Sequence, residues 1–147
     1  MNIEKFMVLE NKLNENKEAV LLVNLGEFRK LKDYKELYVH ILKTVTAAVL
    51  KSKENNNEQY VVKANFENAE IKNADAGFIG QLVTNLQELF PNRLRKCYLY
   101  YPPKIFLMGW KLITPFIDPV TKDKFTVVTK NGELHINDYE SKFKDRV

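Results

Sequence analysis

Short apolar runs alternate with longer segments in which apolar residues recur every three or four positions, and this alternation most constrains the fold. The run at residues 19–25 is rich in β-branched residues and is closed by Gly26, which is typical of a strand covered on both faces. Further runs at residues 59–66, 96–101 and 125–129 predict three more strands. Strands that alternate with helices form βαβ units, so the sequence predicts an α/β fold with a mostly parallel sheet flanked by helices.

Two long amphipathic helices are predicted between these strands. The first has an apolar stripe from Leu37 to Val49, and the second has a stripe from Phe78 to Phe90. Pro91 ends the second helix, because proline lacks the backbone N–H and disfavours helical geometry in the residue before it. Gly77 and Gly80 open the second stripe, and we interpret them as sites of close packing against the sheet.

The two ends of the chain are predicted to be peripheral parts of a single domain over residues 1–147. Apolar residues near the start have a ragged helical spacing, which predicts an amphipathic leader helix over residues 1–18. Residues 131–147 form the expected C-terminal tail, and residues 136–147 within it are predicted to be a short charged helix.

The net charge, the single cysteine and the length of the apolar runs indicate where the protein is expected to be located. The net charge of +4 permits an anionic partner without requiring one. Cys97 is the single cysteine and cannot form an internal disulfide, and the first twenty residues contain no apolar signal segment. The longest apolar run, residues 105–117, is shorter than the ~20 residues of a spanning helix. We therefore expect a reducing, cytoplasmic setting and no transmembrane segment.

The usual motifs of catalysis and cofactor binding are absent from the sequence. It contains no glycine-rich nucleotide loop, no paired-cysteine or histidine metal motif and no nucleophile elbow. His40 lies among apolar helix positions and His135 lies far away in the tail, so we interpret both as structural. Cys97 opens an apolar strand and is predicted to be a buried, inert thiol. The sequence therefore predicts no enzyme, no metal site and no cofactor.

The segment between residues 91 and 119 is difficult to explain as ordinary core. It contains all five prolines, and residues 104–117 within it are apolar around the whole circumference of a helix. Such a helix is either buried on all sides or forms a lid over an apolar ligand or a membrane, and the residues alone leave both interpretations open. Basic residues flank it, which favours an anionic amphiphile unless they are merely solvated loop charges; they are Arg93, Arg95, Lys96, Lys122 and Lys124.

Residues 90–106, Trp110 and residues 115–125 closely resemble the core of the CRAL-TRIO lipid-binding domain family. In this family a tyrosine-proline and an arginine follow a helix, and a mobile gate helix runs into a proline-phenylalanine-leucine-aspartate-proline-valine-threonine segment. The resemblance extends over about residues 19–130 and implies a lipid-binding core there, with an apolar gate helix over a lipid pocket. It also implies binding without catalysis.

The resemblance implies roles for individual residues. Thr121 and Lys124 match the threonine and the basic residue that hold the inositol phosphate in phosphatidylinositol-transfer members. Asn92 takes the place of a glutamate that contacts the inositol hydroxyls, and Arg93 matches the arginine after it. Residues of the apolar segment are expected to contact acyl chains or the bilayer surface, and these are Phe106, Met108, Trp110, Ile113 and Phe116.

The function expected from this resemblance is binding, with or without transfer, of phosphatidylinositol or a phosphoinositide by a peripheral membrane protein. The bound phospholipid is then the ligand, and an exposed apolar lid offers a surface through which two copies could pair. The alternative is a non-enzymatic protein-interaction scaffold, as in a divergent branch of the family, with a pocket filled by side chains.

A nucleic-acid partner is not expected. Tyr98, Tyr100 and Tyr101 lie near basic residues, but neighbouring strand positions point to alternate faces and form no single stacking platform.

Overall fold

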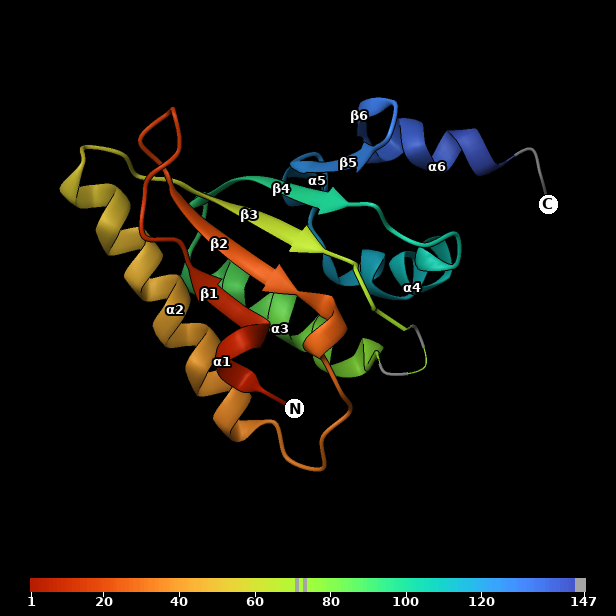
Figure 1. The fold of residues 1–147 in the computed structure, drawn as a ribbon, viewed down its shortest axis with the longest axis horizontal. Coiled ribbons are helices and arrows are strands. Elements are labelled where there is room, and N and C mark those ends of the chain that lie inside the picture. Colours follow the sequence, from red (N-terminus) through yellow and green to blue (C-terminus); the bar gives the residue numbers. More distant parts are fainter. Residues whose placement is uncertain (71, 73, 145–147) are drawn as a thin grey trace.

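A six-stranded sheet forms the centre of the computed structural model, which describes residues 1–70, 72 and 74–144. The strands lie side by side in chain order, with β2 to β5 parallel and the edge strands β1 and β6 antiparallel (Figure 1). This arrangement confirms the predicted α/β fold with a mostly parallel sheet. The strands are β1 (Met7–Leu9), β2 (Ala19–Asn24), β3 (Tyr60–Asn65), β4 (Leu94–Tyr100), β5 (Phe125–Thr129) and β6 (Gly132–His135).

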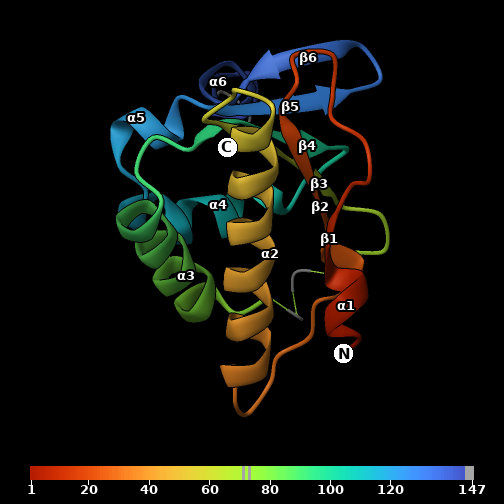
Figure 2. The ribbon, with the colours of Figure 1, turned by 90° about the vertical axis from the view of Figure 1, so that its left-hand side faces the viewer.

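The helices α2, α3 and α4 lie on the same side of the sheet (Figure 2). Connections between neighbouring parallel strands are right-handed, so strands that follow one another in one direction place every crossover helix on one face. The α-helices are α1 (Ile3–Phe6), α2 (Lys35–Glu54), α3 (Ala76–Leu89), α4 (Phe106–Ile113), α5 (Pro119–Lys122) and α6 (Ile136–Lys144), with 3-10 turns η1 (Leu25–Glu27) and η3 (Thr114–Phe116).

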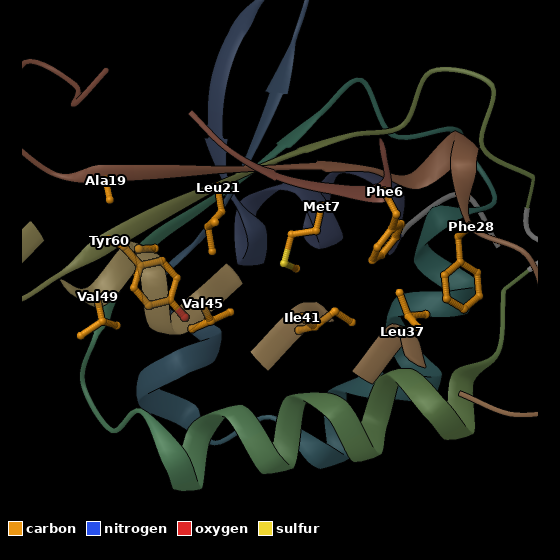
Figure 3. Close-up of a cluster of buried hydrophobic side chains, with 11 residues drawn as sticks. Phe6, Met7, Ala19, Leu21, Phe28, Leu37, Ile41, Val45, Val49 and Tyr60 are labelled. Atoms are coloured by element: carbon orange, nitrogen blue, oxygen red, sulfur yellow. The ribbon is translucent and has the colours of Figure 1, made fainter. Parts of the chain in front are cut away.

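Two clusters of buried side chains hold the helices to the sheet. In the first cluster, Leu37, Ile41 and Val45 of α2 face the side chains of Phe6, Met7 and Leu21 (Figure 3), as the predicted apolar stripe requires. The second cluster joins α4 and α6 to β4 and β5, and its buried members are Ala64, Cys97, Leu99, Phe106, Trp110, Ile117, Val127, Ile136 and Tyr139. The same face of the sheet therefore carries both clusters.

The leader helix predicted over residues 1–18 is wrong, because helix α1 covers only Ile3–Phe6. The chain then forms the edge strand β1, in which Val8 pairs with Leu22. The imidazole Nε2 of His40 lies 2.9 Å from the carbonyl oxygen of Met7, so this histidine is structural, as predicted. Pairing with the sheet satisfies backbone groups and buries Met7, and this outweighs the weak helical spacing of the sequence.

The C-terminal residues belong to the core and not to a separate tail. Residues 132–135 form β6, which pairs with β5 through a turn where Gly132 has a φ of 111°. The helix predicted over residues 136–147 is confirmed over residues 136–144, and residues 145–147 lie outside the described residues. Ile136 and Tyr139 are buried in the second cluster, so this helix contributes to the fold that positions α4.

A buried ion pair ties the start of β2 to β4. Glu18 is 1% exposed and accepts hydrogen bonds from Nε of Arg95 and, at 3.1 Å, from Nδ2 of Asn14. The hydrogen bond to Glu18 raises the pKa of the Arg95 guanidinium, which stays charged. The carboxylate therefore depends on Arg95 for its charge partner.

Replacement of Arg95 should destabilise the fold. Arg95→Leu leaves the buried Glu18 carboxylate without its cation, so we expect the free energy of unfolding in urea to fall by about 1–3 kcal/mol. The double variant Glu18→Gln/Arg95→Leu removes the buried charge and should recover most of the loss. An equal loss in the single and double variants would contradict this role of Arg95.

Asp75 begins α3 and joins it to the loop before α2. Its Oδ1 accepts from the backbone N–H of Phe78 at 3.1 Å, and its Oδ2 accepts from the hydroxyl of Tyr34 at 2.9 Å. The rings of Tyr34 and Phe78 stack with centroids 4.0 Å apart. The hydrogen bond from Phe78, and then the one from Tyr34, lowers the pKa of Asp75 from its ordinary value of 3.8. These contacts set the position of α3.

The Asp75 cap should give a pH-dependent contribution to stability. Because its folded-state pKa lies below 3.8, the contribution is present above that pH and is lost as the pH falls through the folded-state pKa. We expect Asp75→Ala to lower the free energy of unfolding by about 1 kcal/mol at neutral pH. Urea unfolding should show this gap narrowing as the pH is lowered below 3.8; a gap independent of pH would contradict the prediction.

Candidate functional site: an apolar cavity under helices α3 and α4

A cavity of about 800 Å³ lies between the sheet and the helices on its covered face. This volume falls within the range of about 300–1,000 Å³ that is usual for small-molecule sites. Side chains of the sheet form the floor, and these include Leu21, Val23, Tyr60, Val62, Ala64, Leu94, Cys97, Leu99 and Phe125. The wall is therefore almost entirely apolar, and it suits a hydrocarbon ligand.

Helix α3 forms one side of the cavity. Its stripe residues Phe78, Leu82 and Leu86 line the cavity and are only partly buried, although the sequence pattern is that of a helix packed on a core. Within α3 only Gly80 is fully buried. The apolar face of α3 therefore borders open space between itself and the sheet, where a bound apolar molecule would complete its burial.

Gly80 packs against η3 and not, as predicted, against the sheet. A Cβ atom at Gly80 would lie 2.6 Å from the ring of Phe116, so only glycine allows this approach. The side chain of Gln87 reinforces the contact, since its Nε2 donates to the carbonyl of Phe116 at 3.0 Å and its Oε1 accepts from the N–H of Asp118 at 3.0 Å. Phe116, predicted as a gate residue, does not line the cavity.

The predicted gate segment forms α4 and η3, and α4 has two different faces. Phe106 and Trp110 are buried, whereas Met108 is 65% exposed and Leu112 is 63% exposed. The predicted gate residues Phe106, Met108, Trp110 and Ile113 line the cavity, as does Leu112. Helix α4 is therefore neither buried on all sides nor fully exposed; it is a wall of the cavity with an apolar outer surface.

The polar side chains Asn92, Thr121 and Lys124 line one end of the cavity. Asn92 precedes β4 and Lys124 precedes β5, and the amino ends of these neighbouring parallel strands share one edge of the sheet. The N–H of Cys97, in the middle of β4, donates to the carbonyl of Lys124 at 3.0 Å, which fixes the start of β5 against β4. No ion pair of the Lys124 ammonium group occurs within the described residues, so its charge is available to a ligand.

The hydroxyl of Thr121 is already engaged within α5. It donates to Oδ2 of Asp118 at 3.1 Å, while the backbone N–H of Thr121 donates to Oδ1 at 2.7 Å. The structure therefore places Thr121 beside Lys124 but presents its hydroxyl to a carboxylate, and binding a phosphate there would require this hydroxyl to rotate.

Arg93 does not line the cavity, although it was predicted as a head-group residue. Its Nη1 donates to the carbonyl of Glu58 at 3.2 Å and lies 3.8 Å from Oε2 of the same residue. Neighbouring Asn92, which has a φ of +59°, does line the cavity.

Two weakly acidic groups face the cavity from its floor. Burial raises the pKa of Cys97 to about 12, and burial also raises the pKa of Tyr60 well above its ordinary value. Both groups are therefore neutral at physiological pH, and Cys97 is the inert buried thiol that the sequence predicts. The hydroxyl of Tyr60 points from β3 toward Val45 (Figure 3), and its ring forms part of the cavity wall.

Tyr98 and Tyr100 lie on the face of the sheet turned away from the cavity. They are two positions apart on β4, so they share a face, and their ring centroids are 6.3 Å apart. The expectation that these tyrosines point to alternate faces is therefore wrong for this pair. Lys96 lies 5.2 Å from the centroid of the Tyr98 ring.

The sequence predicted the cavity residues of α4 but not those of the sheet, which form the floor of the cavity. Leu21, Val62 and Leu99 have the pattern of ordinary strand core, and no local signal distinguishes a residue that faces a cavity from one that faces a helix. Within residues 1–70, 72 and 74–144, no group of three metal-binding side chains comes together, and no helix is long and apolar enough to cross a membrane.

Solved structures show that this fold occurs elsewhere. The crystal structure of Sfh5 matches with a TM-score of 0.64 and 18% sequence identity, over 85% of this chain and 48% of that one. The chain thus spans about half the length of Sfh5, and the likeness concerns the fold. In all, 34 chains of solved structures match. No protein of curated function matches the sequence.

The sequence profile of the CRAL/TRIO domain matches residues 4–142. This span exceeds the expected core of residues 19–130 at both ends, in agreement with the pairing of β1 and β6 with the central strands. The resemblance carried by residues 90–106 and 115–125 is thereby confirmed. A match over almost the whole described chain shows that the chain belongs to the CRAL/TRIO domain family, and the sheet and the cavity agree with it.

Proposed function

We propose that the protein binds a phospholipid in the cavity under α3 and α4 and exchanges it with a membrane surface, without a chemical step. The carrying observation is the cavity of about 800 Å³, whose apolar walls from the sheet, α3 and α4 are left partly exposed. Each methylene that leaves water for such a site contributes about 0.8 kcal/mol. A hydrocarbon chain therefore supplies the burial that the side chains of this domain leave incomplete.

The alternative function, a protein-interaction scaffold, predicts a pocket filled by side chains. An open cavity lined by Val62, Leu82 and Leu99 argues for lipid uptake instead. The volume of the cavity distinguishes the two functions, whereas membership of the family does not, because both functions occur within it.

Phosphatidylinositol or a phosphoinositide is the proposed ligand. Lys124 supports this assignment, because its charge is unpaired within the described residues and it lies at the polar end of the cavity. A phosphate there would form a charge-assisted contact with the ammonium group. Asn92 offers amide hydrogen bonds to inositol hydroxyls, and Thr121 contributes once its hydroxyl leaves Asp118.

The outer face of α4 supports docking on an anionic bilayer as a peripheral protein. Met108 and Leu112 border the cavity and are also largely exposed to solvent, and Lys104 and Lys111 are exposed on the same segment. Residues 104–117 contain no acidic side chain. Apolar groups flanked by lysines fit the boundary between head groups and acyl chains.

Removal of the Lys124 charge should weaken recognition of the head group. We expect Lys124→Ala to lower the affinity for phosphatidylinositol vesicles about tenfold, because a charge-assisted hydrogen bond is lost. The measurement is co-sedimentation with phosphatidylinositol and with phosphatidylserine vesicles at matched surface charge. Circular dichroism should show an unchanged fold.

Lys130→Ala is the matched control, since it removes the same charge from the exposed turn between β5 and β6. Equal losses in the two variants, or equal binding of both lipids by the wild type, would reduce the effect to nonspecific electrostatics. That result would overturn the assignment of Lys124 as a head-group residue.

Filling the cavity should prevent lipid uptake without unfolding the protein. Val62→Trp projects a larger side chain from the floor into the space that the ligand would occupy, and we expect at least about tenfold less lipid extracted from vesicles. Val128→Trp, on the opposite face of the sheet, makes the same change and should extract lipid like the wild type. Undiminished extraction by Val62→Trp would rule out this cavity as the lipid site.

A further inference from the structure

The indole of Trp110 anchors the buried side of α4 to the C-terminal helix. Trp110 is 2% exposed, and its Nε1 donates to Oε1 of Glu140 in α6 at 2.9 Å. The ring also packs on Phe106 and Phe125, with centroids 5.9 and 5.0 Å away. A buried N–H that loses its acceptor costs much more than one that returns to water, so this hydrogen bond holds α4 in place.

The same carboxylate oxygen also contacts the segment that carries the head-group residues. Nζ of Lys122, the last residue of α5, lies 3.5 Å from Oε1 of Glu140, and both side chains are about one-third exposed. Lys122 follows Thr121 directly and is two residues before Lys124. One oxygen of Glu140 therefore joins the gate helix to the polar end of the cavity.

We propose that Glu140 is a positioning residue that couples the gate helix α4 to the head-group segment at residues 121–124. A phosphate held by Thr121 and Lys124 lies next to Lys122 in the chain and attracts this cation away from Glu140. The Glu140 carboxylate then has no competing cation, and it accepts more strongly from the Trp110 N–H, which holds α4 against α6. The coupling deepens the proposed function and rests on it, because it explains how a ligand bound at one end fixes the cavity wall at the other.

Trp110 reports the state of the gate directly, because it is the single tryptophan of the chain. In the lipid-free protein, Glu140→Leu removes the acceptor, so we expect emission to shift to longer wavelength and acrylamide quenching to increase. Glu140→Gln keeps an oxygen for the indole N–H and should restore the wild-type emission. Glu133→Leu, an exposed change on β6, is the matched control and should leave emission unchanged.

Lipid release provides the second readout. We expect Glu140→Leu to release bound fluorescent phosphatidylinositol roughly 5- to 100-fold faster than the wild type, as an unsatisfied buried donor implies. Glycerophosphoinositol should shift the Trp110 emission of the wild type but not of Glu140→Gln, which has no charge to hold Lys122. Circular dichroism of each variant excludes loss of the fold as the cause.

The outcomes separate this inference from the proposed function. If the wild type takes up lipid but Glu140→Leu matches it in emission and release rate, the coupling is overturned and the lipid site stands. If the wild type takes up no lipid while Glu140→Leu still shifts the emission and Gln restores it, Glu140 holds the gate and the proposed function fails. Emission that shifts equally in Glu140→Gln and Glu140→Leu would also overturn the role of the hydrogen bond.

Discussion

The order of the parallel strands is the constraint on which the rest of the structure depends. Because β2 to β5 lie side by side in chain order, right-handed crossovers place α2, α3 and α4 on one face of the sheet. Helix α2 packs directly on β2, whereas α3 borders a cavity. Helix α4 closes this cavity from the side, so the cavity follows from the topology and not from any single residue.

Helix α4 combines a fixed side with an apolar outer side. Phe106 and Trp110 anchor it in the second cluster, while Met108 and Leu112 remain exposed at the cavity. Its preceding and following turns contain Pro103 and Pro115, which limit the helix to two turns and reduce the backbone hydrogen bonds that resist movement. Movement of this helix, which the proposed exchange of lipid requires, would break its contacts with the second cluster, α3 and η3 and the hydrogen bond from Trp110 to Glu140.

Long apolar patterns in the sequence predicted the central strands and helices, but the short edge strands β1 and β6 were not predicted. The apolar runs of β2, β3 and β5 and the stripes of α2 and α3 are long enough for periodicity to identify them. Strands β1 and β6 have three and four residues, which is too few for a recognisable pattern, although β6 pairs with β5 across a short turn. Thr121 and Lys124, which belong to one contiguous motif, both line the cavity, whereas Arg93 does not line it and contacts Glu58.

The sequence by itself determined the class of fold, the inert character of Cys97 and the apolar nature of residues 104–117. Residue type and the spacing of apolar residues are enough to predict these properties, because they indicate which side chains are buried and whether a segment is a helix or a strand. Only the tertiary structure decided which apolar residues face the cavity, since Val62 lines it and Val49 packs in the first cluster although the two side chains are equally hydrophobic. It also decided that Gly80 receives the ring of Phe116 and that Glu140 meets both Trp110 and Lys122. Such contacts join residues far apart in the chain, and only the packing of the helices on one sheet face brings them within reach.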